Sequence, residues 1–204
     1  MQVSFLKKYQ PELFEDFIIE HEYINLLETL IHMNNLNIMI IGNNGSGKSS
    51  ILSALINEYY KNIKKESIKD NILFINNLKE QGIQYYRNEL KTFCQTKSLI
   101  HNKKKIIVLD DIDIINEQSQ QVFRNCIDKY SHNVHFLCSC LNSQKVIDSI
   151  QSRCTIIKLK PFNNETLYKI AEMIVDQENI DIDTESINFI INISNNSLRQ
   201  IINY

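Results

Sequence analysis

Five short apolar runs recur along the chain, and amphipathic stretches separate them. Each run holds few charged residues, as expected of strands covered on both faces of a parallel sheet. The predicted strands are Leu36–Ile41, Ile72–Asn76, Lys105–Asp110, Asn133–Cys140 and Thr155–Leu159. After the first strand, apolar residues fall on one helix face at Ile51, Leu52, Leu55 and Ile56. Strands that alternate with helices predict an α/β fold with a parallel five-stranded sheet.

The hydrophobic pattern changes after Pro161. Apolar residues now recur at the helical spacing i, i+3, i+4, i+7 and i+8, at Leu167, Ile170, Ala171, Ile174 and Val175. A second helix is expected around Ile187–Ile191, and a third begins near Ser197. We therefore expect one domain over residues 1–160 and a small helical domain over residues 161–204 that is incomplete.

Composition narrows the class of protein. Hydrophobic residues make up 43% and charged residues 23% of the 204 residues. These values are ordinary for a soluble globular chain and exclude a disordered, collagen-like or disulfide-stapled protein. The net charge is −2, which excludes a protein that coats nucleic acid by charge alone. Any contact with nucleic acid must therefore be a local patch.

Cysteine usage and the N-terminus bear on the compartment. The five cysteines form no CxxC pair, so buried free thiols are expected rather than a zinc site or a disulfide framework. The first residues contain no apolar run of signal-peptide length, and no run in the chain is long enough to span a bilayer. We expect an intracellular protein of a reducing compartment, in the nucleus, the cytoplasm or a viral replication site, with no membrane partner.

The segment Gly42–Ser49 reads GNNGSGKS and fits the pattern G-x-x-x-x-G-K-[ST] after a strand and before a helix. Such a loop turns its backbone N–H groups toward an anion, and the positive end of the following helix faces the same anion. Lys48 would add a charge at the β- and γ-phosphates of a nucleotide, and the Ser49 hydroxyl would ligate Mg²⁺. The residues predicted to bind nucleotide here are Gly42, Asn43, Asn44, Gly45, Ser46, Gly47, Lys48, Ser49 and Ser50.

A second acidic element follows about 60 residues later, where the apolar strand Ile106–Leu109 ends in Asp110 and Asp111. A carboxylate at the end of a strand is where nucleotide hydrolases with such a loop hold their metal ion. Asp110 is predicted to bind Mg²⁺, and Asp111 stands where a general base would polarise the attacking water.

The stretch from Asp110 to Phe162 resembles the small subunits of the replication factor C clamp loader, which belong to the AAA+ class. Further segments agree with that family, and together they extend the resemblance over essentially the whole chain. They are Lys8–Pro11, Gln81–Ile83, Tyr86–Phe93, Gln151–Cys154 and Ser197–Gln200. The resemblance implies a P-loop AAA+ three-layer sandwich, followed by a helical lid domain with the collar domain absent.

The chain has only four arginines, and all of them fall on arginine positions of the family pattern: Arg87, Arg124, Arg153 and Arg199. The resemblance implies that Arg153 is a finger supplied in trans to the γ-phosphate of a neighbouring subunit. It implies that Arg199 is a second sensor that reaches the nucleotide from the lid.

The resemblance also implies a DNA-binding surface. Arg87 and Lys91, with the helix start near Gly82, would follow template phosphates in a contact with the DNA backbone. A solvated helix face is nearly as good an interpretation of these residues. Gln121 resembles a glutamine that links the nucleotide and DNA faces, and an ordinary polar position explains it equally well.

Four features depart from the family pattern. Asp111 replaces the catalytic glutamate, so hydrolysis is expected to be slow while binding survives. Leu141 aligns with the first sensor asparagine and Asn142 follows it; either the strand end shifts by one residue and Asn142 contacts the nucleotide, or that contact is missing. Gln10 replaces an arginine. The chain also ends where the family's collar domain would begin, so it is either a fragment or part of a differently built oligomer.

The function implied is an ATP-binding clamp-loader small subunit that uses ATP and Mg²⁺ to load a sliding clamp on primer–template DNA. Its partners would be the other subunits of a hetero-oligomeric ring, the clamp and the backbone of the DNA. Residues near Ile114 and Ile115 would face the clamp or belong to the core. Two alternatives stay open: a catalytically weak subunit that donates Arg153, and an AAA+ ATPase that loads an origin or a helicase. A simple P-loop kinase is the least expected.

Overall fold

The computed structural model describes residues 4–18, 21–75 and 83–204. Its centre is a five-stranded sheet in the order β2-β3-β4-β1-β5, and every neighbouring pair of strands is parallel. The strands are β1 (Ile38–Ile41), β2 (Ile72–Ile75), β3 (Lys105–Leu109), β4 (Val134–Cys140) and β5 (Thr155–Lys158). All five predicted strands and their parallel arrangement are confirmed, with ends one or two residues shorter than expected; Asn76 lies outside the described residues.

Helices connect the strands and continue beyond the last one. They are α1 (Phe5–Lys8), α2 (His21–His32), α3 (Lys48–Tyr59), α4 (Lys65–Ile68), α5 (Ile83–Gln95), α6 (Glu117–Tyr130), α7 (Asp148–Gln151), α8 (Asn164–Glu178), α9 (Thr184–Ile193) and α10 (Leu198–Asn203). Short 3₁₀ turns lie at η1 (Phe14–Asp16), η2 (Lys69–Asn71), η3 (Ile112–Ile114) and η4 (Ser143–Lys145).

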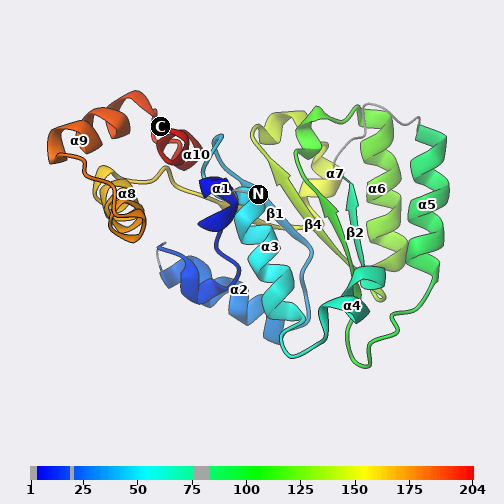
Figure 1. Cartoon of the computed structure of the whole chain (residues 1–204). Helices are drawn as coiled ribbons and strands as arrows, with labels where there is room; N and C mark the ends of the chain where they lie inside the picture. Colours follow the sequence, from blue (N-terminus) through cyan, green and yellow to red (C-terminus); the bar gives the residue numbers. More distant parts are fainter. Residues whose placement is uncertain (1–3, 19–20, 76–82) are drawn as a thin grey trace.

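The sheet separates two layers of helices, with α2 and α3 on one side and α5 and α6 on the other (Figure 1). Strand residues alternate between the two hydrophobic cores, because successive side chains point to opposite faces. Ile38 and Ile40 of β1 pack in the core that contains α2 and α3, and Met39 packs in the core that contains α5 and α6. The three-layer α/β sandwich expected from the sequence is therefore confirmed.

The strand order brings the carboxyl ends of β1, β3 and β4 to the same edge of the sheet. Ile41 at the end of β1 is paired with Cys140 of β4, and Leu109 at the end of β3 is paired with Cys138. The segments that leave these strands therefore start close to one another. In open parallel sheets, ligands bind at this carboxyl edge.

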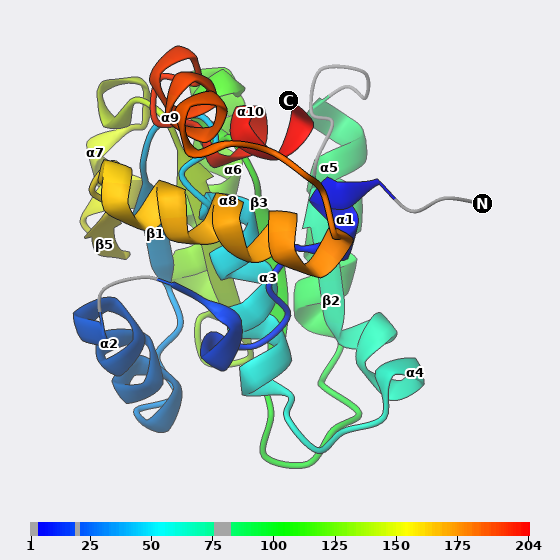
Figure 2. The same cartoon turned by 60° about the vertical axis from the view of Figure 1, so that its left-hand side comes forward.

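Helices α8, α9 and α10 group together at one side of the molecule and come to the front when it is turned (Figures 1 and 2). They enclose a small hydrophobic cluster of their own, which includes Leu167, Ile187 and Ile201. The division into domains over residues 1–160 and 161–204 stays a prediction.

The cysteines and the helices bear on two further expectations from the sequence. All five cysteines are free thiols, four of them buried and Cys154 partly so. Among the described residues, no helix is both long and apolar enough to cross a bilayer.

Candidate functional site

The loop between β1 and α3 is shaped by two glycines in the left-handed region. Gly45 has φ +74° and Gly47 has φ +86°, a conformation that costs glycine little and other residues more. A Cβ on Gly45 would lie 2.2 Å from the Ser197 hydroxyl at the start of α10. The carbonyl of Gly45 also accepts a hydrogen bond of 3.3 Å from the Leu198 amide. The loop is therefore in direct contact with the C-terminal helices.

Lys48 is the first residue of α3 and is only 7% exposed. Its ammonium group donates to the carbonyl oxygens of Gly42 at 2.9 Å and Asn43 at 3.0 Å. Among the described residues no carboxylate forms an ion pair with it. These hydrogen bonds thus go to carbonyl dipoles, which are weaker partners for an ammonium group than an anion would be.

Ser46 supplies a second sign that the loop is built for an anion. Its hydroxyl oxygen is buried and has no hydrogen-bond partner among the described residues. A buried hydroxyl without a partner costs free energy, so such groups usually mark a place that water or a ligand fills. The buried charge of Lys48, the unpartnered hydroxyl and the start of a 12-residue helix fit a phosphate group.

Asp110 lies directly after β3 and joins three elements of the site. Its Oδ2 accepts from the Ser49 hydroxyl of α3 at 2.8 Å, and its Oδ1 accepts from the Ser139 hydroxyl of β4. The Ser139 oxygen in turn accepts from the Asp111 amide at 3.0 Å. A hydroxyl and a carboxylate in direct contact are the hard oxygen donors that Mg²⁺ prefers. Ser139 was missed by the sequence analysis, and a lone hydroxyl in the buried strand was its only signal.

Asp111 adopts the left-handed conformation, with φ 55°. Aspartate and asparagine tolerate this conformation better than most residues other than glycine. Burial raises the pKa of the Asp111 carboxyl, and the negative charge of Asp110 adds to that rise. Attraction to Lys48 and Arg199 acts in the opposite direction and lowers its pKa. Arg199 from α10 and Lys48 from α3 therefore act on the same carboxylate.

The segment after β4 is held by Asp113. One oxygen of this carboxylate accepts from the amides of Leu141 at 3.2 Å and Asn142 at 3.1 Å. The Asn142 side-chain oxygen accepts from the Gln144 amide at 2.9 Å and so caps η4. Leu141 is 39% exposed. The side-chain oxygen of Asn142 is thus already used as a helix cap. A nucleotide contact by Asn142 stays a prediction.

Two adjacent glutamines at the start of α6 have different surroundings, and a linking role for Gln121 stays a prediction. Gln121 is exposed, whereas Gln120 is fully buried. The Gln120 amide nitrogen donates to the carbonyls of Ile112, Ile115 and Lys145, and its oxygen accepts from the Ile147 amide. Gln120 therefore ties α6 to the segments that follow both β3 and β4.

Arg153 follows α7 and is bound within its own chain. Its Nε donates to Asp128 of α6, and its Nη1 donates to the Ser149 carbonyl at 2.6 Å and the Ser152 hydroxyl at 3.3 Å. These hydrogen-bond partners all lie outside the loop that holds Lys48. A contact of Arg153 with the γ-phosphate in a neighbouring subunit stays a prediction.

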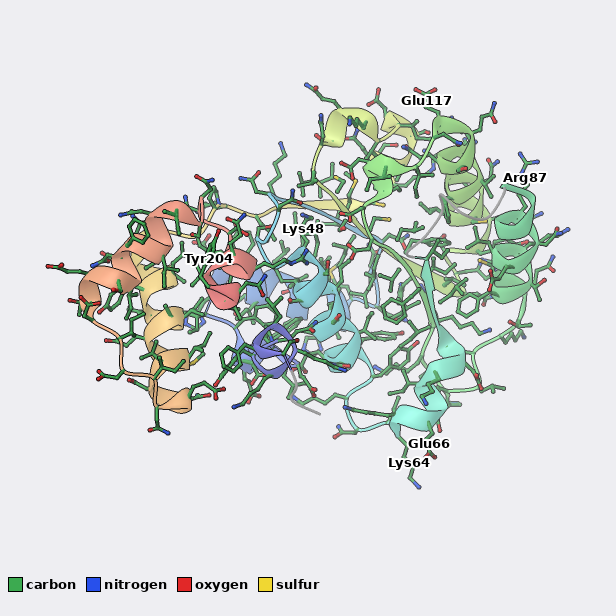
Figure 3. The ribbon with its side chains drawn as sticks, turned by 45° about the horizontal axis from the view of Figure 1, so that its top comes forward. Lys48, Lys64, Glu66, Arg87, Glu117 and Tyr204 are labelled. Atoms are coloured by element: carbon green, nitrogen blue, oxygen red, sulfur yellow. The ribbon has the colours of Figure 1, made fainter. Side chains whose placement is uncertain are left out.

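The predicted DNA contacts lie on α5. Arg87 and Lys91 are exposed and one helical turn apart, and Figure 3 shows Arg87 at the outer edge of the molecule, away from Lys48. Gln81 and Gly82, from the segment Gln81–Ile83 that resembles the family, lie outside the described residues. Ile114 is 53% exposed on η3, while Ile115 is partly buried against the core.

An apolar pocket that the sequence analysis did not predict opens beside the loop. It lies between the N-terminal segment, α3, α8 and α10. Its lining includes Tyr9, Pro11, Phe17, Ser46, Ile51, Phe162, Ile170, Met173, Leu198 and Ile202. The walls of this pocket are mostly apolar, and it lies next to the loop Gly42–Ser49. Such a pocket suits a flat aromatic group such as a nucleobase. The hydroxyl of Tyr9 and the ammonium of Lys8 both bond Glu178 of α8, at 2.6 and 2.5 Å, which joins the N-terminal segment to the helices opposite.

Comparison with known proteins places the chain in a family of ATPases, which agrees with a loop that fits phosphate. Residues 38–162 match the family described as ATPase family associated with various cellular activities (AAA). The whole chain is similar to the replication factor C small subunit of Methanococcus maripaludis, with 31% identity over 204 residues. Replication factor C subunit 5 of Mus musculus is 26% identical over 202 residues, or 98% of this chain. The chain spans 64% of the first relative and 59% of the second.

Solved structures share the fold at low sequence identity. A RuvB variant of Thermotoga maritima covers 96% of this chain and 64% of its own, with a TM-score of 0.74 and 14% identity. A protein related to the DNA polymerase III gamma subunit, from the same organism, covers 72% of this chain and 49% of its own, with a TM-score of 0.58 and 18% identity.

Proposed function

Because the chain belongs to the AAA family of ATPases, we propose that it binds ATP with Mg²⁺ at the loop Gly42–Ser49 and hydrolyses it as the small subunit of a clamp loader. In this role it joins other subunits in a ring and places a sliding clamp on primer–template DNA. The similarity of the whole chain to replication factor C small subunits supports this choice among the functions of the family. The single observation that carries the proposal is the convergence of Lys48, Ser49, Asp110 and Asp111 at one edge of the sheet.

The loop would hold the phosphates. Lys48 exchanges its bonds to the Gly42 and Asn43 carbonyls for phosphate oxygens, which are stronger partners for an ammonium group. The Ser46 hydroxyl gains the partner that it lacks. The adenine base takes the apolar pocket between Tyr9 and Leu198, and the division of the chain near residue 161 leaves that pocket between the two proposed domains.

Ser49 and Asp110 would hold Mg²⁺, which neutralises charge on the β- and γ-phosphates. Asp111 accepts a proton from the attacking water. Its carboxylate is one methylene shorter than that of glutamate, and a misplacement of about 1 Å can cost on the order of 10²-fold in rate. Arg199 approaches the same site from α10, and Arg153 serves the nucleotide of the adjoining subunit.

The test is ATP turnover by the full chain alone, with primer–template DNA, and with the subunits that co-purify with it. We expect weak turnover alone and a rise when DNA and the other subunits are added together. Lys48→Met should abolish turnover under every condition, since it removes the charge and keeps the apolar stem. Lys64→Met is the matched control, because Lys64 is an exposed surface lysine. Absence of stimulation by any combination would contradict a motor role.

A second function is favoured by two specific observations: Asp111 stands in place of a glutamate, and the Asn142 oxygen is used as a helix cap. The chain would then bind ATP as a structural clasp and donate Arg153 while hydrolysing little itself. Single-turnover hydrolysis of ATP bound to this chain separates the two functions. Binding without hydrolysis in the assembled ring favours the clasp, and hydrolysis within the turnover time of the ring favours the motor.

A further inference from the structure

The guanidinium of Arg153 belongs to a cluster of three charged side chains. Asp128 on α6 accepts from Arg153 Nε, and its other oxygen lies 3.2 Å from Arg124 Nε, four residues earlier on the same helix. We call Arg124, Asp128 and Arg153 the arginine–aspartate cluster. One carboxylate thus lies between two guanidinium groups that come from different elements.

The remaining bonds of Arg153 fix the direction of its planar group. Nη1 donates to the Ser149 carbonyl at 2.6 Å and to the Ser152 hydroxyl at 3.3 Å, which uses both of its hydrogens. Nε is used by Asp128. Within the described residues, Nη2 is the donor group left over, and the side chain stays 30% exposed. A guanidinium held at Nε and Nη1 can still offer two N–H groups to a phosphate.

Arg124 acts on the Asp128 carboxylate by charge, because its Nε lies 3.2 Å from that carboxylate but forms no hydrogen bond among the described residues. The hydrogen bond from Arg153 lowers the pKa of Asp128, and the charges of Arg153 and Arg124 lower it further. The carboxylate is therefore kept ionised and turned toward Arg153. An exposed ion pair of this kind contributes little to folding stability, so its value would lie in orientation.

We propose that Asp128 is a positioning residue for Arg153, which holds the guanidinium by Nε so that Nη2 faces the nucleotide of the adjoining subunit. This inference rests on the proposed function, because it requires Arg153 to act in trans. It goes beyond that function by assigning Asp128 and Arg124 to the same task. Asp128 would touch neither nucleotide nor metal and would act through Arg153 alone.

A double-mutant cycle on ATP turnover by the assembled ring tests the inference. Asp128→Ala should lower turnover about 10- to 100-fold through misplacement of the finger, and Arg153→Ala should lower it by about 10³-fold or more. The double variant should be no slower than Arg153→Ala. Asp128→Glu should restore part of the rate, and binding of ATP by the variant chain itself should not change. Asp148→Asn removes a nearby exposed carboxylate and should leave turnover unchanged.

The outcomes separate the trans role of Arg153 from the positioning role of Asp128. If Arg153→Ala has no effect, the trans role fails and the inference fails with it. If Arg153→Ala slows turnover and Asp128→Ala does not, the trans role stands and the positioning role is overturned. Faster turnover in Asp128→Ala would also overturn it, because Asp128 would then restrain the finger instead of aiming it.

The isolated full chain provides a second measurement that needs no partner. The Nε–H of Arg153 should give a resolved ¹⁵N-correlated signal with slow solvent exchange at neutral pH, and Asp128→Asn should speed that exchange by about tenfold or more, in line with loss of a charge-assisted hydrogen bond. Equal exchange rates in the two chains would overturn the inference.

Discussion

At the scale of single residues, Asp110 and Asp111, which follow β3, have different surroundings. Asp110 is fixed by two serine hydroxyls, whereas Asp111 adopts a left-handed backbone conformation and has a raised pKa caused first by burial. The sequence predicted both residues from their place at a strand end. It could not predict Ser139, since the hydrogen bond to Asp110 depends on the pairing of β3 with β4.

Asp111→Glu should speed single-turnover hydrolysis, by about tenfold or more, because the longer carboxylate recovers the lost methylene. Affinity for ATP should stay the same, since Asp111 is not among the residues proposed to hold the phosphates. Quenched-flow measurement of ADP formation checks this, and Asp111→Asn should eliminate the reaction. A slower Asp111→Glu chain with unchanged folding would contradict the assignment of Asp111 as the base.

His135 of β4 gives a pH-dependent stability. It is 1% exposed, its Nδ1 accepts from the Leu36 amide at 3.3 Å, and its Nε2 lies 3.0 Å from the Asn34 side-chain oxygen. Burial lowers its pKa to about 3, and the charges of Lys104 and Lys103 contribute. The folded chain therefore needs the neutral ring, while the unfolded chain takes up a proton near pH 6.5.

The contribution of the neutral His135 ring to the free energy of unfolding should thus be fully present above about pH 6.5. It should fall by about 1.4 kcal/mol per pH unit as the pH drops toward 3. Between pH 7 and 5 this amounts to about 2 kcal/mol from His135 alone. Urea unfolding at both pH values should show that loss in the native chain and not in His135→Gln. His132→Gln alters an exposed histidine and should keep the native pH dependence; an equal loss in His135→Gln would contradict the account.

At the scale of elements, the sequence predicted the sheet well because the strand signal is local. Apolar runs of four to seven residues mark β1 to β5, and their alternation with helices predicts parallel pairing. The connections between elements were harder to predict. Gln120 and Gln121 are adjacent and chemically identical, and only the rotation of α6 decides that Gln120 is buried and Gln121 exposed.

Gln120→Leu should therefore destabilise the chain by about 2 to 4 kcal/mol, since it leaves buried backbone groups of η3 and η4 without partners. Gln121→Leu should change stability by no more than about 0.5 kcal/mol, as for an ordinary surface position. The free energy of unfolding in urea decides between them. Similar values for the two variants would mean that Gln120 does not join these segments.

At the scale of the whole molecule, the nucleotide site depends on segments that are far apart in the sequence. The N-terminal segment meets α8 through Lys8, Tyr9 and Glu178, and the loop meets α10 through Gly45 and Ser197. The apolar pocket lies between the segments that these contacts join. No local pattern could predict it, although its residues lie in segments that resemble the family.

Glu178→Ala should loosen the N-terminal segment and weaken ATP binding several-fold without unfolding the chain. The expected signature is faster amide exchange in residues 5–17 of the nucleotide-free chain. Glu172→Ala removes an exposed carboxylate from the same helix and should behave like the native chain. Unchanged exchange and affinity in Glu178→Ala would show that this contact does not shape the pocket.

The central claim is that the loop between β1 and α3 binds ATP, and a calorimetric titration of MgATP into the full chain tests it most directly. The account predicts saturable binding at one site per chain, lost in Lys48→Met and preserved in Lys64→Met. Heat of binding that is absent in the native chain, or that is equal in Lys48→Met, would contradict it.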